Sequence, residues 1–363
     1  CEKFHGAVIA HVGNENTRVF REVAQLGAEL ESFGDRTLGS RNEAEVGLIF
    51  DWDNYWALEY TSGPSEDLKY VDQIHQYYQY FYKKNIGVDM IPVDADFSKY
   101  KIVVAPVLYM VKDGMKEALE NFVKNGGILI TTFMSGIVGQ SDNVYLGGYP
   151  GPFREMAGVW VEEIDALAPE QKNKAKFADG STAACGLLCD VMHLEGAKAL
   201  ASYEEDFYAG MPAASKNTYG KGTTYYIATQ FEEEGLAKIL DQAVQEAGVS
   251  SVIPEETGLE VVTRVSDTTR FYFVMNFTDE EQILPESLTG KKDMISQKMT
   301  EHGMKLKKWD VLCFYSRLKY RFACYISPLG NLFIIFLNLS QNSSYNIDLS
   351  CKLLCILLIL QNP

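Results

Sequence analysis

Apolar residues recur at strand and helix spacing along most of the chain, and this pattern divides it into successive elements. A short apolar run at 7–10 precedes a stretch of helical spacing that comprises Val19, Phe20, Val23, Leu26 and Leu30. Thr17 offers a capping side chain before this stretch, and Gly34 can end the helix. Residues 1–40 are therefore expected to form one strand followed by one helix.

From residue 41 to 250 the spacing predicts strands that alternate with helices. The segment between 133 and 223 shows no sustained period and is expected to be irregular. Alternating strands and helices predict an α/β domain with a doubly wound, mostly parallel sheet, of the flavodoxin-like or class I glutamine amidotransferase-like type. Strands are expected at 46–51, 88–92, 101–107, 128–133 and 223–229, and helices at 68–82, 113–125 and around 236–244.

From Gly258 onward the apolar spacing changes to two, which is typical of half-buried strands. Residues 259–265 and 270–277 are expected to form a hairpin around the polar turn at 266–269. A last strand is expected at 309–312. The pattern thus predicts a small antiparallel β domain over residues 255–312.

The composition changes abruptly at residue 313. The chain of 363 residues has a net charge of −16, yet residues 313–363 hold one acid, Asp348, against four basic residues. Apolar runs at 332–337 and 353–360 are shorter than the roughly 20 apolar residues that span a bilayer. The tail is interpreted as aberrant, out-of-frame or read-through sequence without a fold, and a membrane-attached tail is the less favoured alternative. Because the chain opens at Cys1 without a methionine, sequence is also expected upstream.

Charge and cysteine content narrow the classes of function. A net charge of −16 repels nucleic acids and anionic membranes, so neither is expected as a partner. Cys185 and Cys189 form the nearest cysteine pair before the tail, but no second pair lies at zinc-ligand spacing. The two are therefore interpreted as free thiols in a reducing compartment. Neither a metal nor a cofactor is predicted.

Two groups of residues are candidates for function. Glu2 and His5 can point at one ligand from the end of the first predicted strand, because a carboxylate accepts and an imidazole can donate hydrogen bonds. On composition alone an ordinary surface pair is the favoured interpretation. A second group follows the strand at 46–51, where doubly wound sheets bind ligands, and consists of Asp51, Trp52, Asp53, Trp56 and Glu59. Its tryptophans favour a subunit contact over a catalytic role, with a carbohydrate-facing wall as the alternative.

A hydrolase with an amidotransferase-like sheet would need a cysteine nucleophile on a tight strand-to-helix turn and a histidine beside it. The turn after the strand at 128–133 reads Met134-Ser135-Gly136 and contains no cysteine. Cys185, Cys189 and His193 follow no clear strand. Hydrolysis by this domain is therefore the least favoured hypothesis.

Four segments together resemble the glycoside hydrolases of family 42, which are bacterial β-galactosidases. The segments are Glu2-Lys3-Phe4-His5-Gly6-Ala7, residues 17–24, Asp51-Trp52-Asp53-Asn54-Tyr55-Trp56-Ala57 and Leu146-Gly147-Gly148-Tyr149-Pro150-Gly151-Pro152. The resemblance covers residues 1 to about 312. It implies that 1–40 are the remnant of a (β/α)₈ (TIM) catalytic barrel, 41–250 an amidotransferase-like trimerisation domain, 255–312 an incomplete small β domain, and 313–363 an unrelated tail.

The resemblance also implies a chemistry. Family 42 enzymes are retaining glycosidases that hydrolyse terminal β-D-galactosyl residues with two glutamates, both on earlier barrel strands and hence upstream of this chain. Glu2 and His5 match the family's Glu-Lys-Phe-His motif, whose side chains hold galactose hydroxyls, so substrate binding becomes their favoured role. We expect a cytoplasmic homotrimer whose present chain carries no catalytic residue and is inactive alone. A non-catalytic interaction module and an amidotransferase-like hydrolase are the alternatives.

Overall fold

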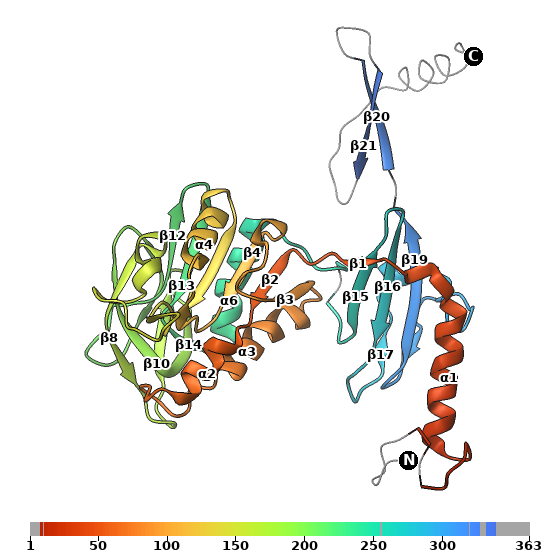
Figure 1. Cartoon of the computed structure of the whole chain (residues 1–363), viewed down its shortest axis with the longest axis horizontal. Helices are drawn as coiled ribbons and strands as arrows, with labels where there is room; N and C mark the ends of the chain where they lie inside the picture. The colour runs from red at the N-terminus through yellow and green to blue at the C-terminus, as the bar shows by residue number, and fades with distance from the viewer. Residues whose placement is uncertain (1–7, 10, 255, 319, 327–331, 339–363) are drawn as a thin grey trace. The chain divides into compact units, whose positions relative to one another are not determined.

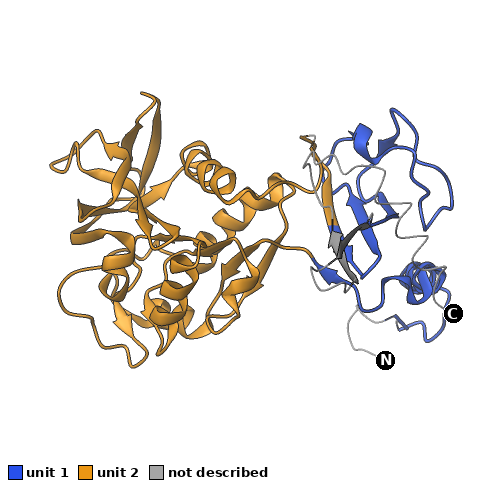
Figure 2. Cartoon of the chain, turned by 90° about the horizontal axis from the view of Figure 1, so that it is seen from above, with its two compact units in different colours: residues 1–42, 263–363 blue, residues 43–262 orange. Residues whose placement is uncertain are grey.

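The computed structural model of the chain describes residues 8–9, 11–254, 256–318, 320–326 and 332–338. It contains two compact units, coloured separately in Figure 2: residues 43–262 form unit 2, and residues 1–42 with 263–363 form unit 1. Segments from opposite ends of the sequence therefore share unit 1, an association that a linear division into domains does not predict. Among the described residues, no helix combines the length and apolar character needed to cross a membrane.

One half of the main sheet in unit 2 is parallel. Its strand order is β3-β2-β4-β6-β13, with neighbours paired in parallel register (Figure 1). The central strands are continuous apolar runs because both of their faces are covered. The five strands of the parallel half are β2 Val46–Ile49, β3 Val88–Ile91, β4 Ile102–Ala105, β6 Ile128–Thr132 and β13 Gly222–Ile227. All five lie where strands are predicted.

Helices cover both faces of the parallel strands. Ile102 and Val104 of β4 join a hydrophobic cluster with α3 and α6, whereas Val103 and Ala105 join a second cluster with α4. Successive strand residues point to opposite faces, so each strand serves both clusters. The helices are α2 Trp52–Tyr60, α3 Tyr70–Lys83, α4 Met115–Lys124 and α6 Glu233–Ala247, with the short α5 Arg154–Ala157. The mixed α/β class and the three predicted helices are confirmed, while helical spacing alone does not reveal α2.

The other half of this sheet is antiparallel and corrects two predictions. Residues between 133 and 223 form regular strands where an irregular segment is predicted. The sheet is parallel from β3 to β13, and the strands beyond β13 pair antiparallel, so it is not mostly parallel as predicted. Its further strands are β8 Val159–Ala166, β9 Asn173–Phe177, β10 Thr182–Leu194, β11 Lys198–Tyr203, β12 Pro212–Tyr219 and β14 Thr229–Phe231. The pattern is hard to detect because the buried positions of β9 are occupied by Asn173 and Ala175, which are polar or small. A separate parallel pair joins β5 Met110–Val111 to β7 Val138–Gly139.

Unit 1 begins with a helix that has little to pack against. Helix α1 Arg18–Phe33 starts where predicted, with the Thr17 hydroxyl accepting from the Phe20 amide at 3.1 Å, and ends at Gly34. All of α1 is described, and it buries none of its sixteen residues. Leu26 and Leu30 of its apolar face are 54% and 60% exposed. The strand predicted at 7–10 lies partly outside the described residues, and Val8 and Ile9 form a bend instead.

A four-stranded antiparallel sheet completes unit 1, in the order β1-β15-β16-β19. The predicted hairpin is present, with the Ser266 amide donating to the Thr269 carbonyl at 2.9 Å. Phe271, Met294 and Cys313 form its buried cluster. The strands are β1 Arg41–Asn42, β15 Glu260–Val265, β16 Thr269–Met275 and β19 Val311–Arg317, beside the short pair β17 Gln282–Ile283 and β18 Lys305–Leu306.

Strand β19 extends past residue 312, where the small β domain is predicted to end. Strand β19 pairs with β16 as far as Arg317, and it buries Cys313 and Phe314. The change in charge at residue 313 falls inside β19, because this strand continues where the acidic residues stop. The tail, which is predicted to have no fold, contains an antiparallel hairpin of β20 Tyr320–Ile326 and β21 Leu332–Asn338. Residues 339–363 lie outside the described part.

Candidate functional site

The group of residues expected near Asp51 lies at the carboxyl end of β2. Asp51 directly precedes α2 and caps its N-terminus, since the Asp51 carboxylate accepts a hydrogen bond from the Asn54 amide at 3.1 Å. A charged side chain at a helix N-terminus satisfies donors that have no partner within the helix. The start of α2 is therefore fixed at the edge of the sheet where ligands and partners of such folds bind.

Two further contacts hold α2 in place. The fully buried Asn54 side chain donates to the Val107 carbonyl at 3.0 Å and accepts from the Met110 amide at 2.8 Å. Lys112 lies 2.7 Å from Asp51 and 2.5 Å from Asp53. Partial burial of the Lys112 ammonium opposes ionisation, but its hydrogen bonds to the two carboxylates outweigh this and raise its pKa. Both acids thus share one lysine as an ion-pair partner, which argues against a pair of carboxylates poised for catalysis.

The outer face of α2 carries an aromatic stripe, defined as Trp52, Trp56 and Tyr60. These residues are four apart, so they share one face of the helix. Their exposed fractions are 58%, 50% and 88%, and the Trp52 and Trp56 rings lie 6.0 Å apart. Large exposed aromatic groups on a rigid element are typical of interfaces. Glu59 is not part of the aromatic stripe. It lines a separate cavity of about 250 Å³, which Met134 also lines.

The turn that an amidotransferase-like hydrolase would use for its nucleophile has the expected strain but different chemistry. Met134 follows β6 with a left-handed φ of 55°, and its side chain is buried. Nearby backbone amides are already engaged: Val107 donates to the Thr132 hydroxyl at 2.7 Å, and Leu108 donates to the Ser135 hydroxyl at 3.0 Å. A methionine with such neighbours offers neither a nucleophile nor free donors for an oxyanion.

Cys185, Cys189 and His193 all lie on β10, in a stretch where the sequence shows no clear strand before them. A hydrogen bond between the two thiols separates their pKa values, lowering that of Cys189 to about 7 and raising that of Cys185, to which burial also contributes. The side chains of Cys185 and Cys189 are both fully buried. His193 instead stacks on Trp160 at 4.5 Å and contacts Glu162 at 2.7 Å. The structure therefore does not assemble an accessible cysteine–histidine pair.

The remaining candidates have different outcomes. Glu2 and His5 lie outside the described residues, so their substrate-binding role stays a prediction. Lys112 is a functional neighbour that sequence reasoning misses, because it stands 61 residues from Asp51 along the chain. Asn54 belongs to a segment singled out in the sequence, but its buried bonds to another loop have no signature in local spacing.

Comparisons with known proteins agree with this arrangement. Residues 44–250 match the family model described as "Beta-galactosidase trimerisation domain", and residues 258–314 match "Beta-galactosidase C-terminal domain". The chain is 48% identical over 311 residues to the β-galactosidase LacZ of Lactobacillus acidophilus, covering 85% of this chain and 46% of that protein. It is 46% identical over 317 residues to β-galactosidase BgaA of a Planococcus species, with 86% and 47% covered.

Solved structures show the same relationship. The β-galactosidase from Bacillus circulans sp. alkalophilus superposes with a TM-score of 0.82 at 44% identity, covering 87% of this chain and 47% of that one. Gan42B, a GH42 β-galactosidase, gives 0.81 at 34% identity, with 87% and 46% covered. The chain spans about half the length of the curated relatives it matches. By its trimerisation and C-terminal domains, the chain belongs to the β-galactosidases of glycoside hydrolase family 42.

Proposed function

We propose that this chain is the C-terminal, assembly-forming part of a retaining β-galactosidase that hydrolyses terminal β-D-galactosyl residues. The family membership and the names of the relatives support the activity of the whole enzyme. The observation that carries the assembly role is the exposed aromatic stripe on α2, since Asn54 and Lys112 fix that helix to a domain of the trimerisation type. The catalytic glutamates belong to the barrel that precedes residue 1 in this scheme.

The assembly is a homotrimer in which the α2 stripe of one copy packs against a different surface of the next. A closed ring with three-fold symmetry requires such unlike surfaces to meet, because only two-fold interfaces pair a patch with itself. Aromatic side chains are enriched at the centres of interfaces and contribute a large share of binding energy. The ion pairs of Asp51 and Asp53 with Lys112 support this role, since a contact surface is better served by paired than by free charges.

Residues 1–40 are the end of the catalytic barrel. The exposed apolar face of α1 supports this proposal, because a last barrel helix buries that face only against neighbouring βα units. Glu2 and His5 would lie at the carboxyl end of the last barrel strand and hydrogen-bond galactose hydroxyls. Residues 41–250 form the trimerisation domain, and 255–312, extended by the rest of β19, form the small β domain.

The finer fold of the trimerisation domain is flavodoxin-like, related to class I glutamine amidotransferases. Numbered by their order along the chain, the parallel strands β3-β2-β4-β6-β13 run 2-1-3-4-5 across the sheet. That order is one of the two common doubly wound arrangements, and the left-handed turn at Met134 supports the amidotransferase likeness. The domain serves as a scaffold rather than an enzyme, because its turn has no nucleophile.

The enzyme works in the cytoplasm and binds neither membranes nor nucleic acids. The buried free thiols Cys185, Cys189 and Cys313 support a reducing compartment. The net charge of −16 supports the absence of polyanionic partners.

Sedimentation of the full chain tests the assembly role. The parent chain is expected to be trimeric at micromolar concentration, and the double variant Trp52→Ser, Trp56→Ser to be monomeric, since each buried interface tryptophan contributes about 2 kcal/mol or more. The control is Phe207→Ser, which removes an aromatic of 70% exposure elsewhere on unit 2. A monomeric parent chain, or a double variant that assembles as well as the control, would count against the proposal.

A chromogenic β-galactoside tests the catalytic part. The gene extended upstream of residue 1 is expected to give an active enzyme, whereas the present chain gives no turnover. Within the active enzyme, Glu2→Gln and His5→Ala should raise KM or lower kcat without changing the trimer. An extended gene that encodes no β-galactosidase activity would refute the assignment.

A further inference from the structure

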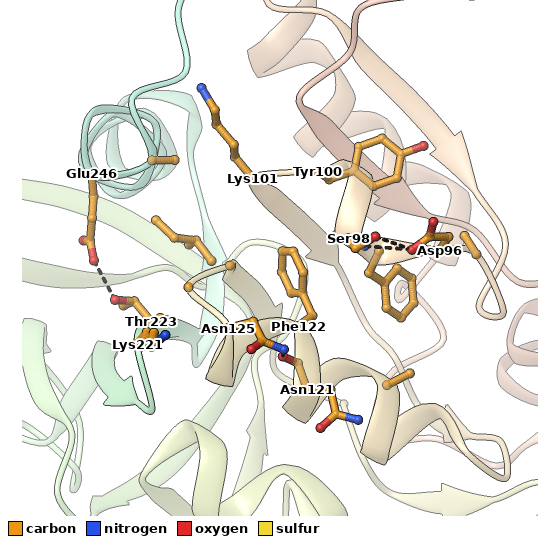
Figure 3. A pocket seen from close by; sticks show the side chains of 18 residues that line it. Asp96, Ser98, Tyr100, Lys101, Asn121, Phe122, Asn125, Lys221, Thr223 and Glu246 are labelled. Carbon is orange, nitrogen blue, oxygen red and sulfur yellow. Dashed lines mark hydrogen bonds between the residues drawn. The ribbon is translucent and has the colours of Figure 1, made fainter. Parts of the chain in front are cut away.

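A cavity of unit 2 lies away from the α2 stripe, at the amino ends of the parallel strands. Its volume is about 680 Å³, within the range of roughly 300–1,000 Å³ that small-molecule sites occupy. Its walls come from residues 95–101, the second half of α4, the first residues of β6 and β13, and the end of α6 (Figure 3). Neither the family comparisons nor the assembly role of the domain accounts for this cavity.

The floor of the cavity is built by close contacts between backbone segments. A Cβ atom on Gly222 would lie 2.2 Å from the Gly127 carbonyl, and one on Gly127 would lie 2.3 Å from the Phe122 ring. Side chains therefore cannot fill these positions. On the wall, Glu246 is held by hydrogen bonds from Thr223 and Tyr225, at 2.5 and 2.7 Å (Figure 3 shows the first). The cavity is thus shaped in advance, which reduces the entropic cost of binding.

Most charged groups around the cavity already have partners. Lys101 contacts Glu45 at 2.7 Å and the Gly248 carbonyl at 3.1 Å, and Asp96 accepts from the Ser98 hydroxyl at 2.6 Å. By contrast, within the described part of the chain the Lys221 ammonium and the Asn121 side-chain amide have no hydrogen bond or ion pair to protein. Both are exposed and line the cavity. They are the groups available to a ligand.

The lining selects a neutral, hydroxyl-rich ligand. Lys101 pairs with Glu45 and Glu246 pairs with Lys216 at 2.7 Å, so the charges of Asp96 and Lys221 offset each other and the cavity has no excess charge. The C-terminal ends of α4 and α6 carry partial negative charge, which disfavours an anion, while the two carboxylates are engaged and unavailable to a cation. The rings of Tyr100 and Phe122 provide apolar surface next to the free amide and ammonium. A sugar matches this mixture, because its C–H faces are apolar and its hydroxyls both donate and accept.

We propose that this cavity is a second carbohydrate site, separate from the barrel, which takes a neutral sugar of one or two rings. The choice of galactosides as its ligands rests on the proposed function. Lys221 and Asn121 bind the hydroxyls, and Phe122 with Tyr100 supplies the apolar wall. A site of this kind would hold oligosaccharide on the assembly domain, outside the catalytic pocket.

The test is a titration of the full chain with lactose and with D-galactose, followed by saturation-transfer NMR. Binding is expected with a Kd on the order of 1 mM. Lys221→Ala and Asn121→Ala should each weaken it about fivefold or more, as expected for one lost hydrogen bond to sugar. The matched controls Lys174→Ala and Asn143→Ala, which change exposed residues outside the cavity, should leave the Kd unchanged. Ala118→Leu fills the cavity from α4 and should abolish binding without touching either polar group.

Three outcomes would overturn the inference. They are an absence of sugar binding at tens of millimolar ligand, binding that survives Ala118→Leu, and stronger binding of inorganic phosphate than of lactose. The double variant Glu2→Gln, His5→Ala separates this site from the barrel remnant. If that variant alone abolished binding, the second site would be refuted while the proposed galactosidase function would be strengthened.

Discussion

The buried carboxyl group of Asp190 is expected to make the stability of unit 2 depend on pH. Asp190 on β10 is 1% exposed and accepts a hydrogen bond from the Tyr226 hydroxyl at 2.7 Å, while its other oxygen has no partner among the described residues. Burial raises the pKa of Asp190 to about 8, although the Tyr226 bond opposes the shift. Its stabilising contribution is therefore complete below the ordinary pKa of about 4 and is lost progressively as pH rises toward 8.

Asp190→Asn should consequently flatten the pH dependence of stability. Between pH 4 and 8 the free energy of unfolding of the parent should fall relative to the variant by several kcal/mol, with about 5 as an upper bound. Urea unfolding at a series of pH values measures this, and Met192→Leu, a neutral buried change on the same strand, is the control. Parallel pH profiles for parent and Asp190→Asn would show that this carboxyl group does not titrate as inferred.

Asn54 is the residue on which the position of the aromatic stripe depends. Asn54→Ala leaves the Met110 amide without a partner in a buried region, whereas the Val107 carbonyl keeps its bond from the Tyr109 amide at 2.8 Å. An unpaired buried amide costs about 1–3 kcal/mol, so the free energy of unfolding should fall by about that amount. Asp53→Ala is the control, because this 56%-exposed side chain belongs to an ion pair worth about 1 kcal/mol or less. Equal costs for the two variants in denaturant unfolding would contradict this role of Asn54.

At the scale of elements, spacing predicts what is apolar and continuous. Strands β4 and β6 are apolar runs covered on both faces, and α3 alternates buried and exposed residues at helical spacing, so each is found from sequence. Strand β9 escapes detection because Asn173, which donates to the Glu205 carbonyl at 3.0 Å, fills a core position that pattern rules reserve for apolar residues. Helix α2 is not predicted from spacing because aromatic residues occupy its solvent-facing side, where pattern rules expect polar residues. The site is predicted where it is local, as at Asp51 and Trp52, and missed where partners such as Lys112 come from distant loops.

Strand β19 provides the corresponding prediction for an element. A chain ending at Leu312 loses Cys313 and Phe314 from the core of unit 1, together with the pairs that residues 313–317 make with β16. A chain ending at Leu318 keeps both, as well as the Leu318 amide bond to the Thr268 carbonyl at 2.8 Å. Removing a buried phenylalanine side chain typically costs 3–5 kcal/mol. Hydrogen exchange of β16 amides should therefore be fast in the shorter chain and as slow as in the full chain in the longer one. Equal protection in both truncated chains would restore the boundary at 312.

At the scale of the whole molecule, charge opposes the association that the aromatic stripe favours. Each copy carries a net charge of −16, so bringing copies together requires work against their mutual repulsion. Salt reduces this repulsion: the screening length falls from about 30 Å at 0.01 M to about 8 Å at 0.15 M. Apolar contacts between aromatic rings are not weakened by the same change.

Sedimentation at increasing NaCl should therefore show the trimer gaining at the expense of the monomer. The double variant Trp52→Ser, Trp56→Ser has the same net charge, so it should feel the same repulsion and yet remain monomeric at every salt concentration. A trimer that dissociates as salt rises would instead mean that ion pairs between copies hold it together. Because that outcome keeps the trimer at low salt and changes only the force that holds it, it would move the interface from the α2 stripe to a charged surface of unit 2.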